Sequence, residues 1–433
     1  MIIHVVQAGE TVADIANKYG ISEEILIRNN EIKTPNNLAI GEILVILIPS
    51  VTHTVQEGDT LNQIAEQYGV SLLQLLRNNP FLSEREYIYP GETLVISYST
   101  EKAGRLSTYG YAYPHIRTDV LKKTLPFLTY ITVYSYSFTD DGRINDLDDS
   151  RIIELARQYQ VAPIMMLSIE DTDQNYAINT MHKLLISQES QEQLFYNVRE
   201  LIRSKGYYGV NLNVPYIYPY ERSNFDEFMI KFSNFLKRDG YAVVFYTMSL
   251  STFEIMTGIV YEGFNYSKLV QRVDGLFLMT YEWGNNIGIP TGIISFDSIR
   301  QYVLGMTERF PAEKMYMGIP ILGYLWELPF ILGESKGYTI TSNAAVELSK
   351  NMGATIYIDD RTKTAYLQYI LGNEYVVRFR DTRSINEFLN MVAEFGLAGI
   401  SIWNIMKFYP QLWLLVNALY DIENIYETDN ISR

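Results

Sequence analysis

The sequence contains no cysteine and only four histidines in 433 residues. The absence of cysteine excludes disulfides, thiolate nucleophiles, zinc ribbons and iron–sulfur clusters. The four histidines, His4, His53, His115 and His182, do not have the spacing of metal ligands. We therefore expect a protein without a metal site and without a cofactor.

Long apolar runs and an excess of basic residues are missing as well. No run approaches the roughly 20 apolar residues that a membrane-spanning helix needs, so we expect no membrane insertion. Met1-Ile2-Ile3-His4 leads straight into a patterned segment without the stretches of a secretory signal, which predicts synthesis in the cytoplasm without a signal peptide. The formal net charge is −15, from 35 basic and 50 acidic residues. This charge excludes nucleic acid as a partner, because phosphate binding needs clustered lysine and arginine.

What the sequence does contain is an internal repeat, in a chain long enough for two or three domains. The stretch His4-Val5-Val6-Gln7-Ala8-Gly9-Glu10-Thr11 returns as His53-Thr54-Val55-Gln56-Glu57-Gly58-Asp59-Thr60. The two histidines occupy the same place at a strand start, which favours a packing or hydrogen-bonding role over catalysis. The similarity continues through Ile15-Ala16 and Ile64-Ala65, Tyr19-Gly20 and Tyr68-Gly69, and Arg28-Asn29-Asn30 and Arg77-Asn78-Asn79.

Each copy of the repeat predicts a βααβ unit. A strand leads to a glycine turn, after which a threonine is placed to cap the first helix and a later glycine to end it. A second helix then ends near the paired asparagines, and a last strand closes the unit. This places the caps at Thr11 and Thr60, the helix ends at Gly20 and Gly69, the closing strands at 43–47 and 93–97, and the whole units at 1–48 and 51–97.

The repeated unit resembles the LysM family in its V-x-x-G-[DE]-T-[VL] start, its I-A-x-x-[YF]-G-[VI]-S turn and its asparagine pair. The resemblance implies binding of N-acetylglucosamine chains, as in peptidoglycan and chitin. The groove of that family lies between the loop after the first strand and the loop before the last. Most of the residues concerned are also ordinary turn and cap residues, and that alternative stays open for each of them. The groove residues implied are Gly9, Thr11, Asn29 and Asn30, and Gly58, Thr60, Asn78 and Asn79.

The rest of the chain predicts an α/β fold, a (β/α)8 TIM barrel over residues 103–427. Eight β-rich segments alternate with amphipathic helical ones such as 149–158, 192–205 and 224–238, which is the pattern of a closed parallel barrel. A segment at about 338–380 is too long for a loop and predicts a small α+β insertion. The expected strands are 106–112, 128–137, 161–168, 208–214, 241–248, 275–281, 315–322 and 398–403.

Three of the expected strand ends carry distinctive runs of residues. They read Leu278-Met279-Thr280-Tyr281-Glu282-Trp283-Gly284, Gly318-Ile319-Pro320-Ile321-Leu322-Gly323-Tyr324-Leu325-Trp326 and Gly399-Ile400-Ser401-Ile402-Trp403. These runs resemble glycoside hydrolase family 18, and among its members the spore-cortex-lytic N-acetylglucosaminidases, which also carry tandem LysM modules. In that family a glutamate at the end of strand four protonates the glycosidic oxygen, and an aspartate two residues earlier steadies the cation that the substrate's own acetamido group forms. The motif is D-x-x-D-x-D-x-E.

This chain departs from the catalytic motif at strand four. Asn211 fits the second position, which is often asparagine in the cortex-lytic members. Tyr208 replaces the first aspartate, Asn213 the assisting aspartate and Pro215 the acid. Proline has no proton to give, and asparagine cannot supply the negative charge that balances a developing cation. Loss of a positioned general acid typically lowers the rate by ~10²–10⁴-fold. We therefore expect a barrel that is inactive as a hydrolase.

Other residues of the barrel bear on activity and sugar binding. Glu221, in the loop after strand four, and Glu170, at the end of strand three, are stand-in candidates for the acid, although each also fits a solvated or structural carboxylate. The resemblance implies an acetyl-binding role for Tyr281, a supporting role for Glu282 and a floor under the sugar for Trp403. Aromatic rings stack on sugar faces without any acid, and Trp403 as a filler of the barrel core remains the alternative. Further stacking surface is expected from Trp283 and Trp326.

Three functions follow as hypotheses. The first is a binding protein of the spore envelope (cortex or coat) whose partner is a peptidoglycan or chitin-type glycan and whose barrel binds glycan without cutting it. The second is an active N-acetylglucosaminidase that degrades cortex in germination with an unusual acid. The third is a scaffold whose barrel contacts spore-coat proteins. Pro215 and Asn213 favour the first over the second, and Tyr281 and Trp403 favour it over the third.

Overall fold

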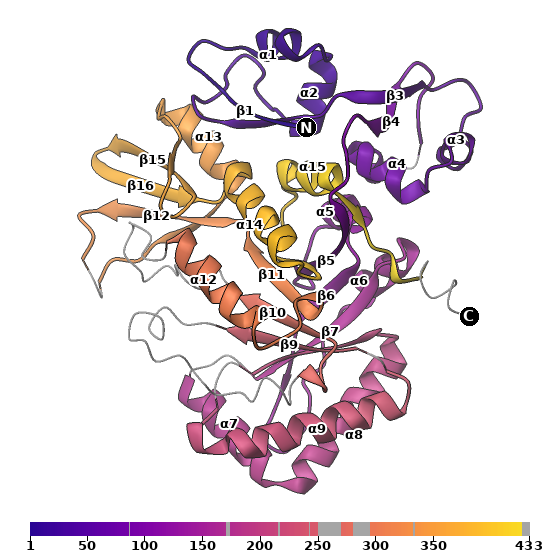
Figure 1. Ribbon diagram of the computed structural model, residues 1–433, viewed down its shortest axis with the longest axis vertical. Coiled ribbons are helices and arrows are strands. Elements are labelled where there is room, and N and C mark those ends of the chain that lie inside the picture. Colours follow the sequence, from indigo (N-terminus) through magenta and orange to yellow (C-terminus); the bar gives the residue numbers. More distant parts are fainter. Residues whose placement is uncertain are drawn as a thin grey trace.

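The structure is a computed structural model that describes residues 1–85, 87–169, 174–214, 217–241, 243–249, 270–279, 295–331 and 334–426. Two small N-terminal modules lie together at one end of the molecule, next to α13 and α15, and a large barrel forms the rest (Figure 1). None of the helices described is long and apolar enough to span a bilayer.

Both modules have the predicted βααβ order. In each, the first and last strands pair in antiparallel fashion, and the first helix begins after a threonine N-cap and ends at a glycine. Gly20 and Gly69 have φ values of 67° and 65°, a left-handed conformation that glycine adopts without steric cost. The first module consists of β1 (Ile2–Val5), α1 (Val12–Tyr19), α2 (Glu23–Asn30) and β2 (Ile43–Ile46), and the second of β3 (Pro49–Thr54), α3 (Leu61–Tyr68), α4 (Leu72–Asn78), a 3-10 turn (Pro80–Glu84) and β4 (Thr93–Tyr98).

The barrel closes as predicted. Eight parallel strands follow one another around it in chain order, and the last pairs with the first through Gly399–Ile402 and Ser107–Gly110. A short extra strand, β18 (Tyr420–Ile422), lies parallel to the start of the first barrel strand. Residues 280–281 of the predicted sixth strand lie outside the described residues. The eight strands are β5 (Gly104–Ala112), β6 (Tyr130–Phe138), β7 (Ala162–Ile169), β8 (Gly209–Asn213), β9 (Val243–Ser249), β10 (Gly275–Met279), β11 (Met315–Pro320) and β17 (Gly399–Trp403).

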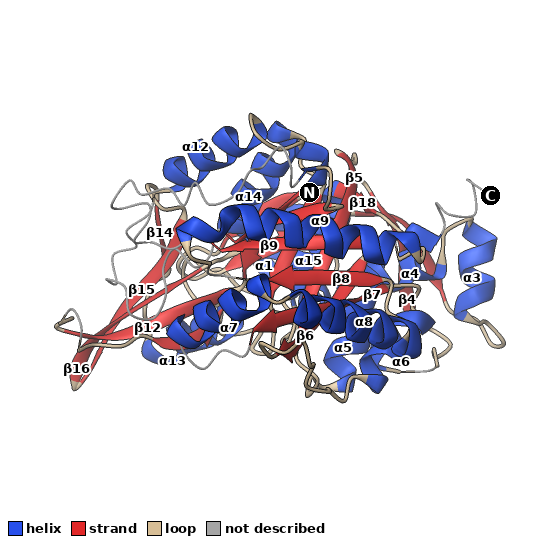
Figure 2. Ribbon diagram, turned by 90° about the horizontal axis from the view of Figure 1, so that it is seen from below, coloured by secondary structure: helices blue, strands red, loops and turns tan. Residues whose placement is uncertain are grey.

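Helices enclose the strands on the outside, with α7, α8 and α9 packed together over β6 to β9 (Figure 2). Their apolar faces meet the outward-facing strand residues in one large buried cluster, while the interior of the barrel is filled mainly by aromatic rings. The described helices of this layer are α5 (Thr118–Thr124), α6 (Ser150–Gln158), α7 (Gln174–Ile186), α8 (Gln188–Lys205), α9 (Arg222–Arg238), α12 (Phe296–Thr307), α14 (Thr382–Phe395) and α15 (Pro410–Leu419), with 3-10 turns at Leu125–Phe127, Pro219–Glu221 and Ala312–Lys314.

The insertion between β11 and α14 is an antiparallel sheet of five strands with one helix. The strand order is β13-β12-β16-β15-β14, and the helix is α13. The sheet takes in β12, which precedes the predicted start near Tyr338, because the chain continues from β11 into β12 with Ile321 alone between them. The elements are β12 (Leu322–Leu328), β13 (Tyr338–Thr341), α13 (Ser342–Met352), β14 (Tyr357–Asp359), β15 (Thr364–Leu371) and β16 (Asn373–Phe379).

The modules are packed against the barrel and its insertion. Apolar residues of β2 and the residue after it form a buried cluster with α15. Asn78 of the second module accepts a hydrogen bond of 2.8 Å from Asn417 of α15. In the first module, the Ile40 carbonyl accepts a hydrogen bond of 2.9 Å from the Ile356 amide of the insertion. Both modules are therefore held by specific contacts as well as by the chain connection.

Candidate functional site

The second position of the degenerate motif, Asn211, lies inside the barrel. Its side chain is completely buried, and its Nδ2 donates a hydrogen bond of 3.3 Å to the hydroxyl of Tyr111 on β5. Tyr109, also on β5, is equally buried, and burial raises the pKa of its hydroxyl well above the usual range. A neutral amide suits this aromatic interior, because a buried carboxylate would need a compensating charge.

Tyr208 and Asn213 lie at opposite ends of β8. The ring of Tyr208, just before the strand, packs against the interior cluster with its centroid 6.3 Å from that of Tyr130 and 6.4 Å from that of Tyr426. Asn213, the last residue of the strand, is half-buried and pairs in register with Ser168 of β7. Tyr208, at the first motif position, thus serves in packing. Asn213, at the third, reaches the C-terminal mouth of the barrel, where active sites of such barrels form.

Trp403 stands at the end of β17, beside a group of tyrosines at the same mouth. It is half-buried, and its ring centroid lies 5.0 Å from that of Tyr134, 5.5 Å from that of Tyr111 and 6.1 Å from that of Tyr113. We call Trp403, Tyr113 and Tyr134 the aromatic bowl. Sequence reasoning did not assign Tyr113 to the site, although Tyr109, Tyr111 and Tyr113 recur at every second residue, a spacing that puts them on one face of a strand.

Glu221 faces the helix layer. It ends a 3-10 turn, is only 1% exposed, and its Oε1 pairs with Nδ1 of His182 on α7. The ring of Tyr218 covers His182 edge-on at 5.8 Å. As a stand-in acid, Glu221 would have to give up this contact with His182.

Five of the predicted site residues lie outside the described structure, and Trp326 has little surface available to a sugar. Pro215, Glu170, Tyr281, Glu282 and Trp283 lie outside the described residues. Trp326 lies in β12 and is only 4% exposed. A Cβ at Gly337 would stand 2.6 Å from its Nε1, so backbone covers the indole and leaves little of it for a sugar.

The asparagine pairs of the modules have their side chains engaged within the protein. Asn30 and Asn79 are buried. The amide nitrogen of each donates to a helix carbonyl and to a carbonyl of the closing strand, and the amide oxygen accepts a hydrogen bond from a backbone amide of that strand. Asn29 donates to the Tyr98 hydroxyl at 3.2 Å, and Asn78 donates to the Ile96 carbonyl at 2.7 Å. These four side chains tie helix to strand, module to module and module to barrel.

The remaining predicted module residues are exposed and belong to turns and caps. Gly9 and Gly58 have φ values of 81° and 90°. Thr11 and Thr60 accept hydrogen bonds from the backbone of the first helical turn, at 3.2 Å and 3.3 Å. They are placed on the loop that follows the first strand of each module, where a ligand has access to them.

The repeated histidines form the same hydrogen bonds in both modules, which confirms the prediction of a hydrogen-bonding role. His4 Nδ1 lies 3.0 Å from the Tyr19 hydroxyl, and Nε2 lies 2.9 Å from Glu10. In the second module the partners are Tyr68 and Asp59, at 3.2 Å and 2.8 Å. Backbone hydrogen bonds, from Gln7 and Gln56 respectively, lower the pKa of both carboxyl groups.

A cavity of about 830 Å³ lies between the second module and the barrel. One side is formed by the loop that carries Thr60 and by the segment before β4, the two loops that the family resemblance assigns to a glycan groove. The other side belongs to α5 and to the residue that follows α6. We call this cavity the second-module groove; its lining includes Thr60, Leu61, Ser83, Tyr87, Lys122 and Tyr159.

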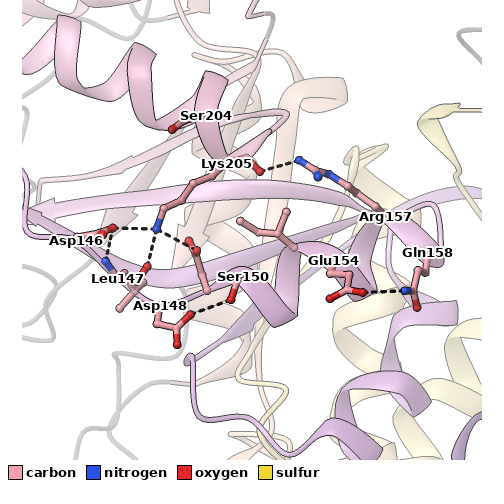
Figure 3. Close-up of a pocket in the computed structure, with 11 residues that line it drawn as sticks. Asp146, Leu147, Asp148, Ser150, Glu154, Arg157, Gln158, Ser204 and Lys205 are labelled. Atoms are coloured by element: carbon pink, nitrogen blue, oxygen red, sulfur yellow. Dashed lines mark hydrogen bonds and ion pairs between the residues drawn. The ribbon is translucent and has the colours of Figure 1, made fainter.

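A second cavity, of about 760 Å³, lies between α6 and α8 on the outside of the barrel (Figure 3). Lys205 points into it and lies 2.9 Å from Asp146 and 3.2 Å from Asp149. Burial opposes the charge of Lys205, but its contacts with Tyr136 and these aspartates outweigh burial and raise its pKa. Asp149 also accepts hydrogen bonds from Tyr136 and Tyr207. Because Lys205 and Asp149 are bonded to side chains of the protein itself, we assign this cluster to the stability of the helix layer.

No group of three or more acidic or histidine side chains in the described part of the chain is arranged to hold a metal ion. The described side chains at the barrel mouth include the amide of Asn213, the rings of the aromatic bowl and the imidazole of His115, whose ring centroid lies 5.6 Å from that of Tyr113.

Comparison with known proteins agrees with this architecture. Residues 94–407 match the description "Glycosyl hydrolases family 18", and residues 4–47 and 53–97 match "LysM domain". The chain is 29% identical over 429 residues to the cortical fragment-lytic enzyme of Bacillus subtilis (strain 168), covering 98% of this chain and 99% of that protein. It is 28% identical over 420 residues to the cortical fragment-lytic enzyme of Bacillus anthracis, covering 95% and 96%. The crystal structure of the Bacillus cereus spore cortex-lytic enzyme SleL superposes with a TM-score of 0.80 at 25% identity, covering 98% of each chain. The chain belongs to the glycosyl hydrolases of family 18 and carries two LysM domains ahead of its barrel.

Proposed function

We propose that this protein binds N-acetylglucosamine glycan of the spore envelope through its LysM modules and its barrel, and that the barrel does not hydrolyse it. The observation that carries the proposal is the composition of strand four. Pro215 stands at the acid position and Asn213 at that of the assisting aspartate, so neither the proton nor the balancing charge of the family mechanism is present at those positions.

Sugar binding is supported by the aromatic bowl. Trp403 is half-buried and flanked by Tyr113 and Tyr134, so that one indole is held rigidly at the barrel mouth. A rigid ring presents stacking surface at little entropic cost, and stacking needs no acid. Tyr111, whose ring contacts Trp403, accepts a hydrogen bond from the neutral amide of Asn211.

A spore location and a peptidoglycan partner are supported by the relatives. The matched proteins are named for the spore cortex, and they align over nearly their whole length with modules included. The same names favour an active hydrolase as the second candidate. That candidate needs another acid, and the described carboxylate nearest to strand four in the chain, Glu221, is paired with His182. A scaffold role among spore-coat proteins is the third candidate function.

The test is to measure binding and cleavage in the same samples. Purified cortex peptidoglycan is sedimented with the protein, and the supernatant is assayed for reducing ends. We expect binding without release. Trp403→Ala should weaken binding of soluble glycan by the barrel about 2- to 10-fold, the value of one stacking contact, while Trp326→Phe, at a buried tryptophan, should not. Reducing ends released by the wild type would favour the hydrolase, and absence of binding would favour the scaffold.

A further inference from the structure

The second-module groove has one wall that does not belong to the module. The 3-10 turn Pro80–Glu84 packs against α5, and this contact brings Lys122 of α5 and Tyr159, just after α6, to the groove. Tyr159 is half-buried between the core of the module and the core of the barrel. The groove is therefore completed by the barrel and would be open on that side in a free module.

Two charged side chains at the groove, Asp59 and Arg85, have hydrogen-bond partners within the second module. Asp59 is bound by His53 at 2.8 Å and by the Gln56 amide at 2.7 Å. Arg85 forms two hydrogen bonds with Glu92, at 2.7 Å and 2.8 Å. Lys122 is half-buried and makes no ion pair with any described residue. Its ammonium group is thus available to an anion from outside, on a protein whose net charge of −15 repels anions elsewhere.

The groove also offers features suited to a sugar. Ser83 is only 5% exposed, and its hydroxyl has no hydrogen-bond partner among the described residues. A buried hydroxyl without a partner is costly, and a ligand polar group would satisfy it. Tyr87 is 60% exposed and held edge-on against Tyr89, with ring centroids 5.2 Å apart. Leu61 and Leu72 add apolar surface for an acetyl methyl group.

The first module is placed differently. Its loop before the last strand packs against the barrel insertion: a Cβ at Gly41 would meet the Ile356 carbonyl oxygen at 2.0 Å. The neighbouring Glu42 pairs with Lys350 of α13 in a buried contact of 3.2 Å. In the second module the equivalent glutamate, Glu92, pairs within its own module. The first module thus docks through the Gly41-Glu42 end of this loop, whereas nothing lies near a Cβ at Gly91 and the second module contacts α5 through its 3-10 turn.

We propose that the second LysM module and the barrel together form one site for an N-acetylglucosamine glycan that carries a carboxylate, with Lys122 as the group that binds the carboxylate. Such a glycan is a peptidoglycan strand with free muramic acid, whereas chitin has no carboxylate. Lys122 distinguishes the two, because a charge-assisted contact forms with only one of them. The inference rests on the proposed glycan binding and adds which glycan, and which barrel residue selects it.

The experiment is a calorimetric titration of the full-length protein with two tetrasaccharides. One is the neutral tetramer of N-acetylglucosamine, and the other alternates N-acetylglucosamine with N-acetylmuramic acid. We expect the acidic tetramer to bind more tightly and to lose affinity with added salt. Lys122→Gln should weaken the acidic tetramer about 10-fold and leave the neutral one unchanged, and Lys122→Arg should retain most of the affinity. Lys231→Gln, on α9 at the far end of the molecule (Figure 1), is the control for net charge.

The outcomes separate this inference from the proposed function. If the wild type binds neither tetramer, the proposed glycan binding and the inference fail together. If it binds both and Lys122→Gln affects neither, or affects both equally, only the role of Lys122 is refuted. Retention of the folded state in each variant is checked by its melting temperature, which should not move because Lys122 has no ion pair to lose among the described residues.

Discussion

The ion pair between Glu42 and Lys350 is predicted to hold the first module to the barrel insertion. Glu42 Oε1 lies 3.2 Å from Lys350 Nζ, and the two side chains are 8% and 3% exposed. Glu42 Oε2 accepts a hydrogen bond of 2.9 Å from the Ala39 amide. Glu347, one turn earlier on α13, also lies 3.2 Å from Lys350. The lysine therefore lies between two carboxylates, a buried one of Glu42 and a partly exposed one of Glu347.

Lys350→Met should remove the compensating charge and leave the Glu42 carboxylate buried. Breaking a buried pair by removal of one partner costs about 3–5 kcal/mol. If docking of the first module contributes less free energy than this, the module should separate from the insertion. The measured loss of stability should then equal the free energy of docking. Arg85→Met in the second module is the comparison, because the pair of Arg85 and Glu92 is about a quarter exposed and should cost only about 1 kcal/mol.

The loss of stability caused by Lys350→Met should also depend on pH. Burial raises the pKa of Glu42, and Lys350 acts in the opposite direction. A carboxyl group whose pKa is raised on folding favours the folded state when it is protonated, and this contribution is lost as the pH rises through the folded pKa. Without Lys350 the pKa rises further, so the destabilisation should be large at neutral pH and small below the usual pKa of glutamate.

The assay is denaturant unfolding at pH 7 and pH 4, combined with hydrogen exchange at the Ile356 amide, which donates to Ile40 across the interface. The double variant Glu42→Gln, Lys350→Met should recover most of the stability, since no buried charge remains. A loss below about 1 kcal/mol, or an equal loss at both pH values, would refute a buried, charge-compensated interface.

Three further predictions concern the modules. Glu10 and Asp59 have lowered pKa values, so their contribution to folding is present at neutral pH and lost as the pH falls through those values; melting curves from pH 7 to 3 should show it, and a flat profile would contradict it. Asn79→Ala should destabilise the protein by about 2–3 kcal/mol in urea unfolding, because it leaves buried backbone groups unpaired. Gly41→Ala should cost more than Gly91→Ala, because both have positive φ but only the first meets a neighbour; equal losses would contradict the close docking.

The order of elements was predictable from the sequence, because apolar segments separated by turn and cap residues mark each strand and helix. The start of the insertion was not, since β11 and β12 follow each other with no turn residue that separates them. The asparagine pairs illustrate another limit. The repeat identified them as important, but only coordinates reveal that Asn30 and Asn79 are bonded inward and that Asn78 meets α15.

The candidate site was predictable where it lies at strand ends. Trp403 was placed at the barrel mouth because the eighth strand ends there. The walls contributed by other domains were not predictable. Lys122 and the second module are brought together by tertiary packing, and the same is true of Glu42 and Lys350. Local sequence patterns carry no information about such contacts, because these contacts depend on how folded domains pack against one another.

The most direct test of a glycan-binding barrel that lost its acid is product analysis by mass spectrometry. The wild type and a Pro215→Glu, Asn213→Asp variant are incubated with soluble cortex fragments, and binding is measured in parallel. We predict that the wild type binds the fragments and releases nothing, and that the variant gains cleavage at N-acetylglucosamine. Release of products with N-acetylglucosamine at the reducing end by the wild type would contradict it and direct attention to Glu221 and Glu170 as the source of the proton.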